Sequence, residues 1–289
     1  MCWDSATPPR VPLRPRPESA PGISPGMAAN HSPPLQLKCE VKPAIVVPFY
    51  NHERAIAGTV ASLRPYRLRC WIVDDGSDAR CRPVLEELAR GESDWLSVLW
   101  LAPNRGKGHA VMSGMRAAAA AGYSHGVQID ADGQHDAADL QRLLDQAARH
   151  PAAVITGVPI YDASVPKGRL YGRYITHLWV WINTLSFEIR DSMCGFRVYP
   201  LAPALRVWDE QRVGARMQFD TEILVRLFWL GTRVISVPTR VTYPRDGVSH
   251  FDLWRDNLRI SAMHTRLFFG MLRRLPRLLS QRPPPQVQP

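Results

Sequence analysis

The sequence predicts an α/β fold in which a mostly parallel sheet is flanked by helices. Short apolar runs rich in β-branched residues recur over residues 44–157, and helix-forming segments of about ten residues separate them. Acidic clusters directly follow two of the apolar runs. Strands that alternate with helices of this length usually form a parallel sheet. Ligands of such sheets bind beyond the carboxyl ends of the strands, so the acidic clusters are the first candidates for function.

The first five elements follow from local composition. Residues 44–48 are apolar and β-branched, which predicts a buried strand, and a helix is expected over 54–63. Residues 70–73 predict a second strand, which ends at Asp74-Asp75-Gly76-Ser77. A helix over 82–90 and a third strand over 96–101 complete this part of the chain.

The next elements repeat the alternation. Residues 110–121 contain four successive alanines, the best helix formers, and predict a helix. Residues 126–129 predict a fourth strand, which ends at Asp130-Ala131-Asp132. A helix over 137–148 and a strand over 153–157 follow, and a later apolar helix is expected over 223–230.

Prolines mark the ends of the folded region. Ten of the 26 prolines fall in residues 1–43, and four follow Arg282. We expect residues 1–40 to be a disordered, proline-rich leader, with Met27 as an alternative start of the native protein. A folded domain is expected over 41–250, and a basic amphipathic helical tail over 251–289.

The tail carries much of the basic charge. The chain has a formal net charge of +10, and from Arg266 onward there are five arginines and no acid, which suits anionic lipid or nucleic acid. Seven apolar residues of the tail share one helical face: Leu267, Phe268, Met271, Leu272, Leu275, Leu278 and Leu279. That face suits a membrane surface or packing on the domain, and Pro276 is expected to kink or end the helix.

Other classes of protein receive no support from the sequence. There is no long uninterrupted apolar run for a membrane-spanning helix and no signal-peptide core. The five cysteines are scattered, which argues against a zinc site or a disulfide framework and favours a reducing compartment. No nucleic-acid recognition motif accompanies the basic charge, so nucleic acid is not an expected partner.

Two carboxylates, Asp130 and Asp132, lie one residue apart after a buried strand and before a turn glycine. Such oxygen ligands suit Mg²⁺ or Mn²⁺ that also holds phosphates, although acids here could simply cap the next helix. The loop 104–108, Asn-Arg-Gly-Lys-Gly, is basic and opens a helix, as a diphosphate-binding loop would. It matches neither a Walker A loop nor a dinucleotide fingerprint.

With these motifs the sequence resembles the family 2 glycosyltransferases, in particular the branch of dolichyl-phosphate mannosyltransferases and bacterial polyprenyl-phosphate glycosyltransferases. Six stretches match in the order of the family: 46–51, 73–77, 104–108, 130–135, 191–197 (Asp-Ser-Met-Cys-Gly-Phe-Arg) and 219–222 (Phe-Asp-Thr-Glu). The resemblance implies a GT-A fold and a hexosyltransferase-like enzyme. Such an enzyme transfers a sugar, with inversion, from a UDP-, GDP- or dTDP-linked donor and uses Mg²⁺ or Mn²⁺.

The resemblance also assigns residues to the donor and the metal. Pro48, Tyr50, Glu53 and Asp75 would hold the nucleotide, with Asp74 as a structural turn residue. Lys107, Asp130 and Arg245 would meet the donor diphosphate, and Asp130, Asp132 and Gln134 would bind the metal. Arg245 lies in Arg-Asp-Gly-Val-Ser-His, where the polyprenyl-phosphate branch often ends in lysine; here His250 replaces it.

The acceptor decides the roles of the remaining acids. For a hydroxyl acceptor, Asp220, Glu222 or Asp191 would be the general base, with Asp220 preferred over Glu222. A lipid phosphate needs no base, because it is already an anionic nucleophile. Lys167, Arg169 and Arg173 precede the aromatic stretch 174–187, which suits lipid-phosphate capture at a membrane or an ordinary amphipathic helix.

We therefore expect a glycosyltransferase bound peripherally to the cytoplasmic membrane face, acting on a membrane-associated lipid such as polyprenyl phosphate. The second hypothesis is transfer to a hydroxyl of a glycolipid or other glycoconjugate. Nucleotidyl transfer is a remote third, because the glycine-rich basic loop it would need after the first strand is replaced by Phe49-Tyr50-Asn51-His52.

Overall fold

The computed structural model describes residues 40–161, 167–242 and 252–280. A seven-stranded sheet forms its centre, in the order β3-β2-β1-β4-β6-β5-β7. The strands are β1 (Pro43–Phe49), β2 (Cys70–Asp75), β3 (Leu96–Leu101), β4 (His125–Gln128), β5 (Val154–Tyr161), β6 (Arg197–Pro200) and β7 (Val234–Val241). Every pairing is parallel except those of β6 with β4 and β5. The predicted α/β fold with a mostly parallel sheet is confirmed.

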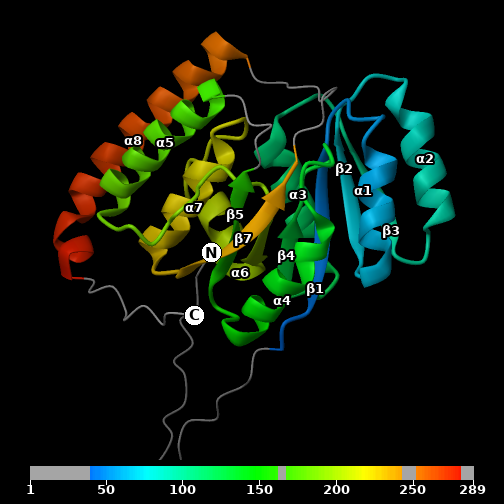
Figure 1. Cartoon of the computed structure of the whole chain (residues 1–289), viewed down its shortest axis with the longest axis horizontal. Helices are drawn as coiled ribbons and strands as arrows, with labels where there is room; N and C mark the ends of the chain where they lie inside the picture. Colours follow the sequence, from blue (N-terminus) through cyan, green and yellow to red (C-terminus); the bar gives the residue numbers. More distant parts are fainter. Residues whose placement is uncertain (1–39, 162–166, 243–251, 281–289) are drawn as a thin grey trace, which may run out of the picture. The chain divides into compact units, whose positions relative to one another are not determined.

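Helices cover both faces of the sheet (Figure 1). They are α1 (Ile56–Leu63), α2 (Cys81–Gly91), α3 (Lys107–Ala120), α4 (Leu140–Arg149), α5 (Lys167–Thr184), α6 (Leu201–Glu210), α7 (Phe219–Leu230) and α8 (Leu253–Ser280), with 3₁₀ turns at Arg64–Tyr66 and Ala137–Asp139. One core cluster joins the sheet to α1, α2 and α4, and the other joins it to α3 and to helices from α5 onward. Strand β1 is buried on both faces, which explains why it reads as a continuous apolar run.

Three element boundaries differ most from the predictions. β5 runs to Tyr161 and not to residue 157, and α7 begins at Phe219, four residues earlier than expected. The helix α3 begins at Lys107, three residues earlier than expected, because Gly106 takes a φ of 103° that few other residues adopt and turns the chain into the helix. Gly114 then brings α3 against β1, since a Cβ at this position would overlap Val46. The segment predicted as one helix over 137–148 is a 3₁₀ turn followed by α4.

The long helix α8 packs on α5 and α7. Figure 1 shows α5 and α8 side by side, and Trp179 of α5 stacks on His264 and contacts Phe268. Leu267 and Met271, predicted on the apolar face, are buried in the core, whereas Leu272 and Leu279 are exposed. The helix continues through Pro276 to Ser280, so the expected end at this proline does not occur. None of the helices in the described ranges is both long and apolar enough to cross a bilayer.

Candidate functional site

The acidic loops predicted from the sequence lie at one edge of the sheet. β2 ends at Asp75, and Asp130 follows β4 by two residues. β1 lies between these strands and is parallel to both. The loop 104–106 follows β3, which is parallel to β2 on its other side. The fold therefore gathers three of the predicted motifs beyond the carboxyl ends of neighbouring strands.

A partly buried ion-pair cluster joins two of these loops to α7. Nζ of Lys107 lies 2.8 Å from each carboxylate oxygen of Asp130 and 2.7 Å from Oδ2 of Asp220. Burial works against the charge of Lys107, but the two carboxylates outweigh it and raise the pKa of the ammonium. We call Lys107, Asp130, Asp132 and Asp220 the lysine cluster. It brings together a predicted diphosphate ligand, both predicted metal carboxylates and a predicted base.

A chain of buried polar side chains positions Asp220. Nε2 of Gln128 in β4 donates to Oδ1 of Asp220 at 2.9 Å, and the Tyr199 hydroxyl donates to Oε1 of Gln128 at 3.3 Å. Arg197, fully buried, donates to the Tyr199 hydroxyl at 3.1 Å and to the backbone oxygen of Asp220 at 2.6 Å. Sequence reasoning gave none of these three partners a role. Polar residues within short buried strands were the signal that could have found them, because such groups need partners.

The residues predicted to hold a divalent metal fit that task. Oδ1 of Asp130 is buried beside the Lys107 ammonium without a well-directed hydrogen bond. Asp132 accepts the backbone amide of Gln134 at 3.0 Å, and burial together with the charge of Asp130 raises its pKa. Among the described residues no group of three or more His, Cys, Asp or Glu is arranged to hold a metal. An ion here would take two carboxylates and further oxygens from substrate phosphates or water, as Mg²⁺ commonly does.

The loop that precedes β6 lies against Asp130, one of the predicted metal ligands. The backbone of Gly195 meets the carboxylate of Asp130 so closely that a Cβ at Gly195 would overlap its oxygens. A larger residue at this point of the Gly-Phe-Arg stretch would have to displace the Asp130 carboxylate. His135 packs on Phe196 with ring centroids 5.5 Å apart, and burial lowers its pKa, so it adds no cation to the cluster near neutral pH.

Asp75, predicted to bind the nucleotide, shapes the neighbouring loop. Its two carboxylate oxygens accept the backbone amides of Arg105 at 3.0 Å and Gly106 at 2.6 Å. The residue is only 2% exposed, and burial raises its pKa. Asp74 accepts the Ser77 amide at 3.3 Å, which fits the expected turn role. In this structure Asp75 therefore fixes the loop that starts α3.

The other predicted nucleotide residues lie around the end of β1. Pro48 is inside the strand and Tyr50 directly follows it. Glu53 pairs with Nε of Arg80 at 3.2 Å and accepts a weak hydrogen bond from Sγ of Cys81 at 3.5 Å. These residues border the loop after β2, so the structure keeps this predicted group together.

A second buried ion-pair cluster links α5 to the loop before β6. Arg173 donates Nε and Nη2 to the two oxygens of Asp191 at 2.6 and 2.7 Å, and Nε2 of His177 lies 3.4 Å from the same carboxylate. The backbone amides of Met193 and Cys194 each donate to Oδ1 of Asp191 at 2.8 Å. Burial opposes the charge of Asp191, but His177 and Arg173 hold its pKa below the ordinary range. We call Arg173, His177 and Asp191 the arginine cluster.

The structure does not bring Glu222 into the lysine cluster. Glu222 is fully buried, pairs with Arg226 at 2.6 Å and Arg266 at 3.1 Å, and accepts the backbone amide of Gly214 at 2.8 Å. It lies two residues after Asp220 on α7, and this spacing turns the two carboxylates in different directions. Glu222 connects α7 to α8 and to the loop after α6, which is a structural role.

Three predicted cationic residues cannot be placed at the site. Lys167 and Arg169 belong to the first turn of α5, but their side chains are outside the described part of the structure. Arg245 and the neighbouring His250 also lie outside the described residues. Of the three residues predicted to bind the acceptor, Arg173 is the one whose side-chain contacts the structure describes.

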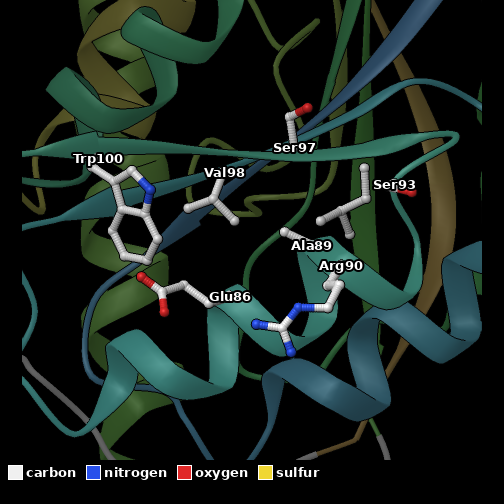
Figure 2. A pocket seen from close by; sticks show the side chains of 8 residues that line it. Glu86, Ala89, Arg90, Ser93, Ser97, Val98 and Trp100 are labelled. Atoms are coloured by element: carbon white, nitrogen blue, oxygen red, sulfur yellow. The ribbon is translucent and has the colours of Figure 1, made fainter.

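A shallow hollow of about 450 Å³ occurs elsewhere on the molecule. It lies between the edge strand β3 and α2, and Figure 2 shows Trp100 and Val98 of the strand facing Glu86 and Arg90 of the helix. None of the predicted site residues lines it. The hollow is therefore distinct from the two ion-pair clusters.

Comparisons with known proteins agree with this geometry. Residues 44–207 match Glycosyl transferase family 2. A polyprenol monophosphomannose synthase from Mycolicibacterium smegmatis is 28% identical over 235 residues, which cover 75% of this chain and 83% of the relative. A dolichyl-phosphate beta-glucosyltransferase from Dictyostelium discoideum is 28% identical over 210 residues, which cover 70% of this chain and 62% of the relative.

Solved structures share the fold at low sequence identity. A mannosyltransferase from Pyrobaculum calidifontis, in complex with GDP-Man and Mn²⁺, has a TM-score of 0.53 at 17% identity and covers 86% of this chain and 67% of its own. Glucosyl-3-phosphoglycerate synthase from Mycobacterium tuberculosis has a TM-score of 0.56 at 18% identity, with coverages of 81% and 80%. These likenesses confirm the GT-A fold, and the family match confirms the predicted enzyme class. The chain belongs to glycosyl transferase family 2 and is a glycosyltransferase.

Proposed function

We propose that this enzyme transfers a sugar from a nucleotide diphosphate to polyprenyl phosphate at a membrane surface, with Mg²⁺ or Mn²⁺ as cofactor and with inversion at the sugar. The relatives named above are synthases of polyprenyl-phosphate or dolichyl-phosphate sugars. The structural observation that supports the proposal best is Arg173, a guanidinium held by Asp191 close to the lysine cluster. The loop that carries Asp191 also brings Gly195 against the Asp130 carboxylate, so the two clusters border one site.

On the donor side, Asp130, Asp132 and Gln134 would hold the metal. The bound ion would neutralise the charge that builds on the nucleotide diphosphate as the glycosyl bond breaks. Lys107 brings a second positive charge to the same place, and Asp75 fixes the loop from which Lys107 projects. The nucleotide would lie along the loops after β1 and β2, near Pro48, Tyr50 and Glu53. Arg245 is proposed as a further diphosphate ligand on its sequence alone.

On the acceptor side, Arg173 would bind the lipid phosphate. A guanidinium offers several donors in a fixed plane and suits a phosphate better than an ammonium does. Asp191 uses two oxygens on Arg173 and two backbone amides on its own loop, so the arginine is held in place before the acceptor arrives. The phosphate is an anion and attacks without a general base. Lys167 and Arg169, from the first turn of the same helix, are proposed as additional phosphate ligands.

The alternative, a hydroxyl acceptor, requires a base. Asp191 is poorly suited, because its carboxylate is engaged by four donors and its pKa is held low. Asp220 is better placed, beside Asp130 and joined to it through Lys107. If the acceptor were a glycolipid hydroxyl, Asp220 would be the base and Lys107 would leave it on substrate binding.

Two exposed apolar stripes support binding to a membrane. On α8 the stripe comprises Trp254, Leu258, Phe269, Leu272 and Leu279, and on α5 it comprises Tyr171, Tyr174, Ile175, Leu178 and Trp179. Each set recurs at helical spacing, and the two helices lie side by side (Figure 1). Arg255, Arg273 and Arg277 of α8 are exposed and would face anionic headgroups. We propose peripheral binding of this surface to the cytoplasmic membrane face.

An acceptor comparison tests the proposal. The full-length protein, with Mn²⁺, is given UDP-, GDP- and dTDP-linked sugars together with polyprenyl phosphate or the matching polyprenol. We expect release of nucleotide diphosphate and a glycosylated lipid with the phosphate only, and the reactive donor identifies the nucleotide. Transfer to the polyprenol alone would contradict the proposal and favour the hydroxyl alternative with Asp220 as base.

A further inference from the structure

The position of Lys107 is not explained by the stability of its helix. Lys107 is the first residue of α3, and the first turn of that helix contains no acidic residue. The amino end of a helix carries partial positive charge, so a cation there is unfavourable. The ammonium instead extends to Asp130 and Asp220, on two other elements, and the side chain is only 22% exposed. Its interactions therefore lie with these carboxylates.

The ammonium occupies the oxygens that a metal would use. Nζ of Lys107 lies 2.8 Å from both oxygens of Asp130, one of the two carboxylates of the proposed metal site. A divalent ion bound to the same oxygens would lie within a few ångströms of the ammonium, and two cations at that distance in a buried site repel each other strongly. The lysine and the metal therefore compete for Asp130.

The formal charge of the cluster allows one divalent ion beside Lys107. Asp130, Asp132 and Asp220 carry three formal negative charges and Lys107 one positive charge, so the net formal charge of −2 equals that of one divalent ion with opposite sign. Asp220 also has Gln128 as a fixed neutral partner, so it remains in place when Asp130 exchanges its cation. The cluster thus has the charge to accept a metal, provided that the ammonium moves away from Asp130.

We propose that Lys107 is an internal counter-ion that occupies both Asp130 and Asp220 in the free enzyme, and that it leaves Asp130 for the incoming diphosphate, while keeping Asp220, when the metal binds. This inference rests on the proposed function, because it assumes the metal at Asp130 and Asp132. Its consequence is that the free enzyme binds metal weakly, while a nucleotide diphosphate gives Lys107 another partner and strengthens metal binding. By linkage, metal and donor then favour each other's binding.

The test measures Mn²⁺ affinity without any activity assay, by electron paramagnetic resonance of free Mn²⁺ or by calorimetry. Five proteins are compared in the absence of nucleotide: wild type, Lys107→Met, Lys107→Met/Asp220→Asn, Asp132→Asn, and Lys42→Met. The double variant removes one positive and one negative charge, so its formal charge equals that of the wild type and Asp220 is not left as a buried acid without its cation. Lys42, which lies over the Tyr123 ring at the opposite end of β1, is the matched control for loss of a lysine.

We expect Lys107→Met and the double variant to bind Mn²⁺ at least about tenfold more tightly than the wild type, and Lys42→Met to be unchanged. We also expect a nucleoside diphosphate to strengthen Mn²⁺ binding in the wild type more than in either variant. If the double variant binds Mn²⁺ like the wild type, the lysine acts only through its charge and the inference is wrong. If Asp132→Asn binds as tightly as the wild type, or no protein binds Mn²⁺, the proposed metal site itself fails and the inference fails with it.

Discussion

The lysine cluster is a partly buried group of ion pairs and the arginine cluster a more deeply buried one, and their charges are balanced differently. In the arginine cluster one carboxylate, Asp191, meets a bidentate arginine, two backbone amides and a nearby histidine. In the lysine cluster a single ammonium serves two carboxylates directly, with Asp132 adding a third. A saturated carboxylate holds its cation in place, whereas an under-neutralised group of carboxylates favours a cation from solution.

This difference assigns the two clusters different tasks. The arginine cluster keeps Arg173 in one orientation, as a preformed phosphate site requires. In the proposed function, metal and diphosphate would enter and leave the lysine cluster during each turnover. The predictions below test whether the two clusters divide the work in this way.

The largest effect is expected at the lysine cluster. Asp132→Asn removes a proposed metal ligand that makes no ion pair with Lys107, so the fold should persist. We expect transfer to fall by about three orders of magnitude, because several kcal/mol of charge stabilisation on the leaving diphosphate are lost. Initial rates at saturating donor, with circular dichroism as the control for folding, measure it. A loss below about tenfold would mean that Asp132 does not hold the metal.

The next effect separates acceptor from donor. Arg173→Met should lower kcat/KM for polyprenyl phosphate by about 100-fold, the size of a lost hydrogen-bonded charge pair, and leave the donor KM unchanged. Arg173→Lys should recover only part of the loss, because it keeps the charge without the paired donors. A rise in donor KM with an unchanged acceptor KM would reverse the roles given to the two clusters.

A third comparison uses two acids on α7. Glu222→Gln leaves Arg226 and Arg266 without their shared carboxylate and should destabilise the protein by about 3 kcal/mol, with little change in kcat of the folded enzyme. Asp220→Asn should have the opposite profile, with a lower kcat and a smaller loss of stability than Glu222→Gln. Thermal melts and rates measure both, and Glu210→Gln, at an exposed pair with Arg206, is the matched control. Loss of activity in Glu222→Gln at unchanged Tm would restore Glu222 as a catalytic candidate.

A smaller effect is expected at the membrane surface. Replacing Trp254, Leu258 and Phe269 together by serine should weaken binding to anionic liposomes by about tenfold or more, because three exposed apolar side chains no longer enter the interface. Liposome flotation measures the binding. Trp100→Ser removes an exposed tryptophan on β3 and should have no effect. Equal binding by the triple variant would exclude this stripe as the membrane contact.

The smallest effect concerns pH. His264 of α8 is buried against Asn183 and Trp179, and burial lowers its pKa to about 4. Between about pH 6.5 and 4 the unfolded chain binds a proton at His264 that the folded chain does not, so stability should fall as the pH falls through this window. Urea unfolding at pH 7 and pH 5 measures the slope. His264→Gln should flatten it, and an unchanged slope would show that His264 does not titrate in this way.

The sequence was sufficient to locate most of the sheet. Strands such as β1 and β3 are apolar runs of distinct length, and the acidic residues mark where β2 and β4 end. β6 and β7 were not predicted. β7 contains Pro238, which interrupts the usual strand pattern. β6 is four residues long, runs antiparallel and begins with an arginine that suggests an exposed site. Arg197 is buried only because Thr156, Tyr199 and the backbone of Asp220 supply its partners. Those partners come together through the tertiary fold.

The same reason limits what could be predicted about the site. Lys107, Asp130, Asp191 and Arg173 were each identified as candidates, but their pairings could not be read, since the partners are 18 or more residues apart. Glu222 looked equivalent to Asp220 in the sequence. Its partner Arg266 is 44 residues away on α8, and only the packing of that helix removes Glu222 from the site.

Removal of the metal tests the central claim of this account most directly, namely that a divalent ion completes the lysine cluster. The protein is stripped with EDTA, dialysed, and assayed for transfer to polyprenyl phosphate with the reactive donor while Mn²⁺ or Mg²⁺ is added back. We predict no transfer without metal, full recovery on addition, and no recovery in Asp132→Asn. Full transfer by the stripped enzyme would contradict the claim and would leave Lys107 as the cation that serves the diphosphate.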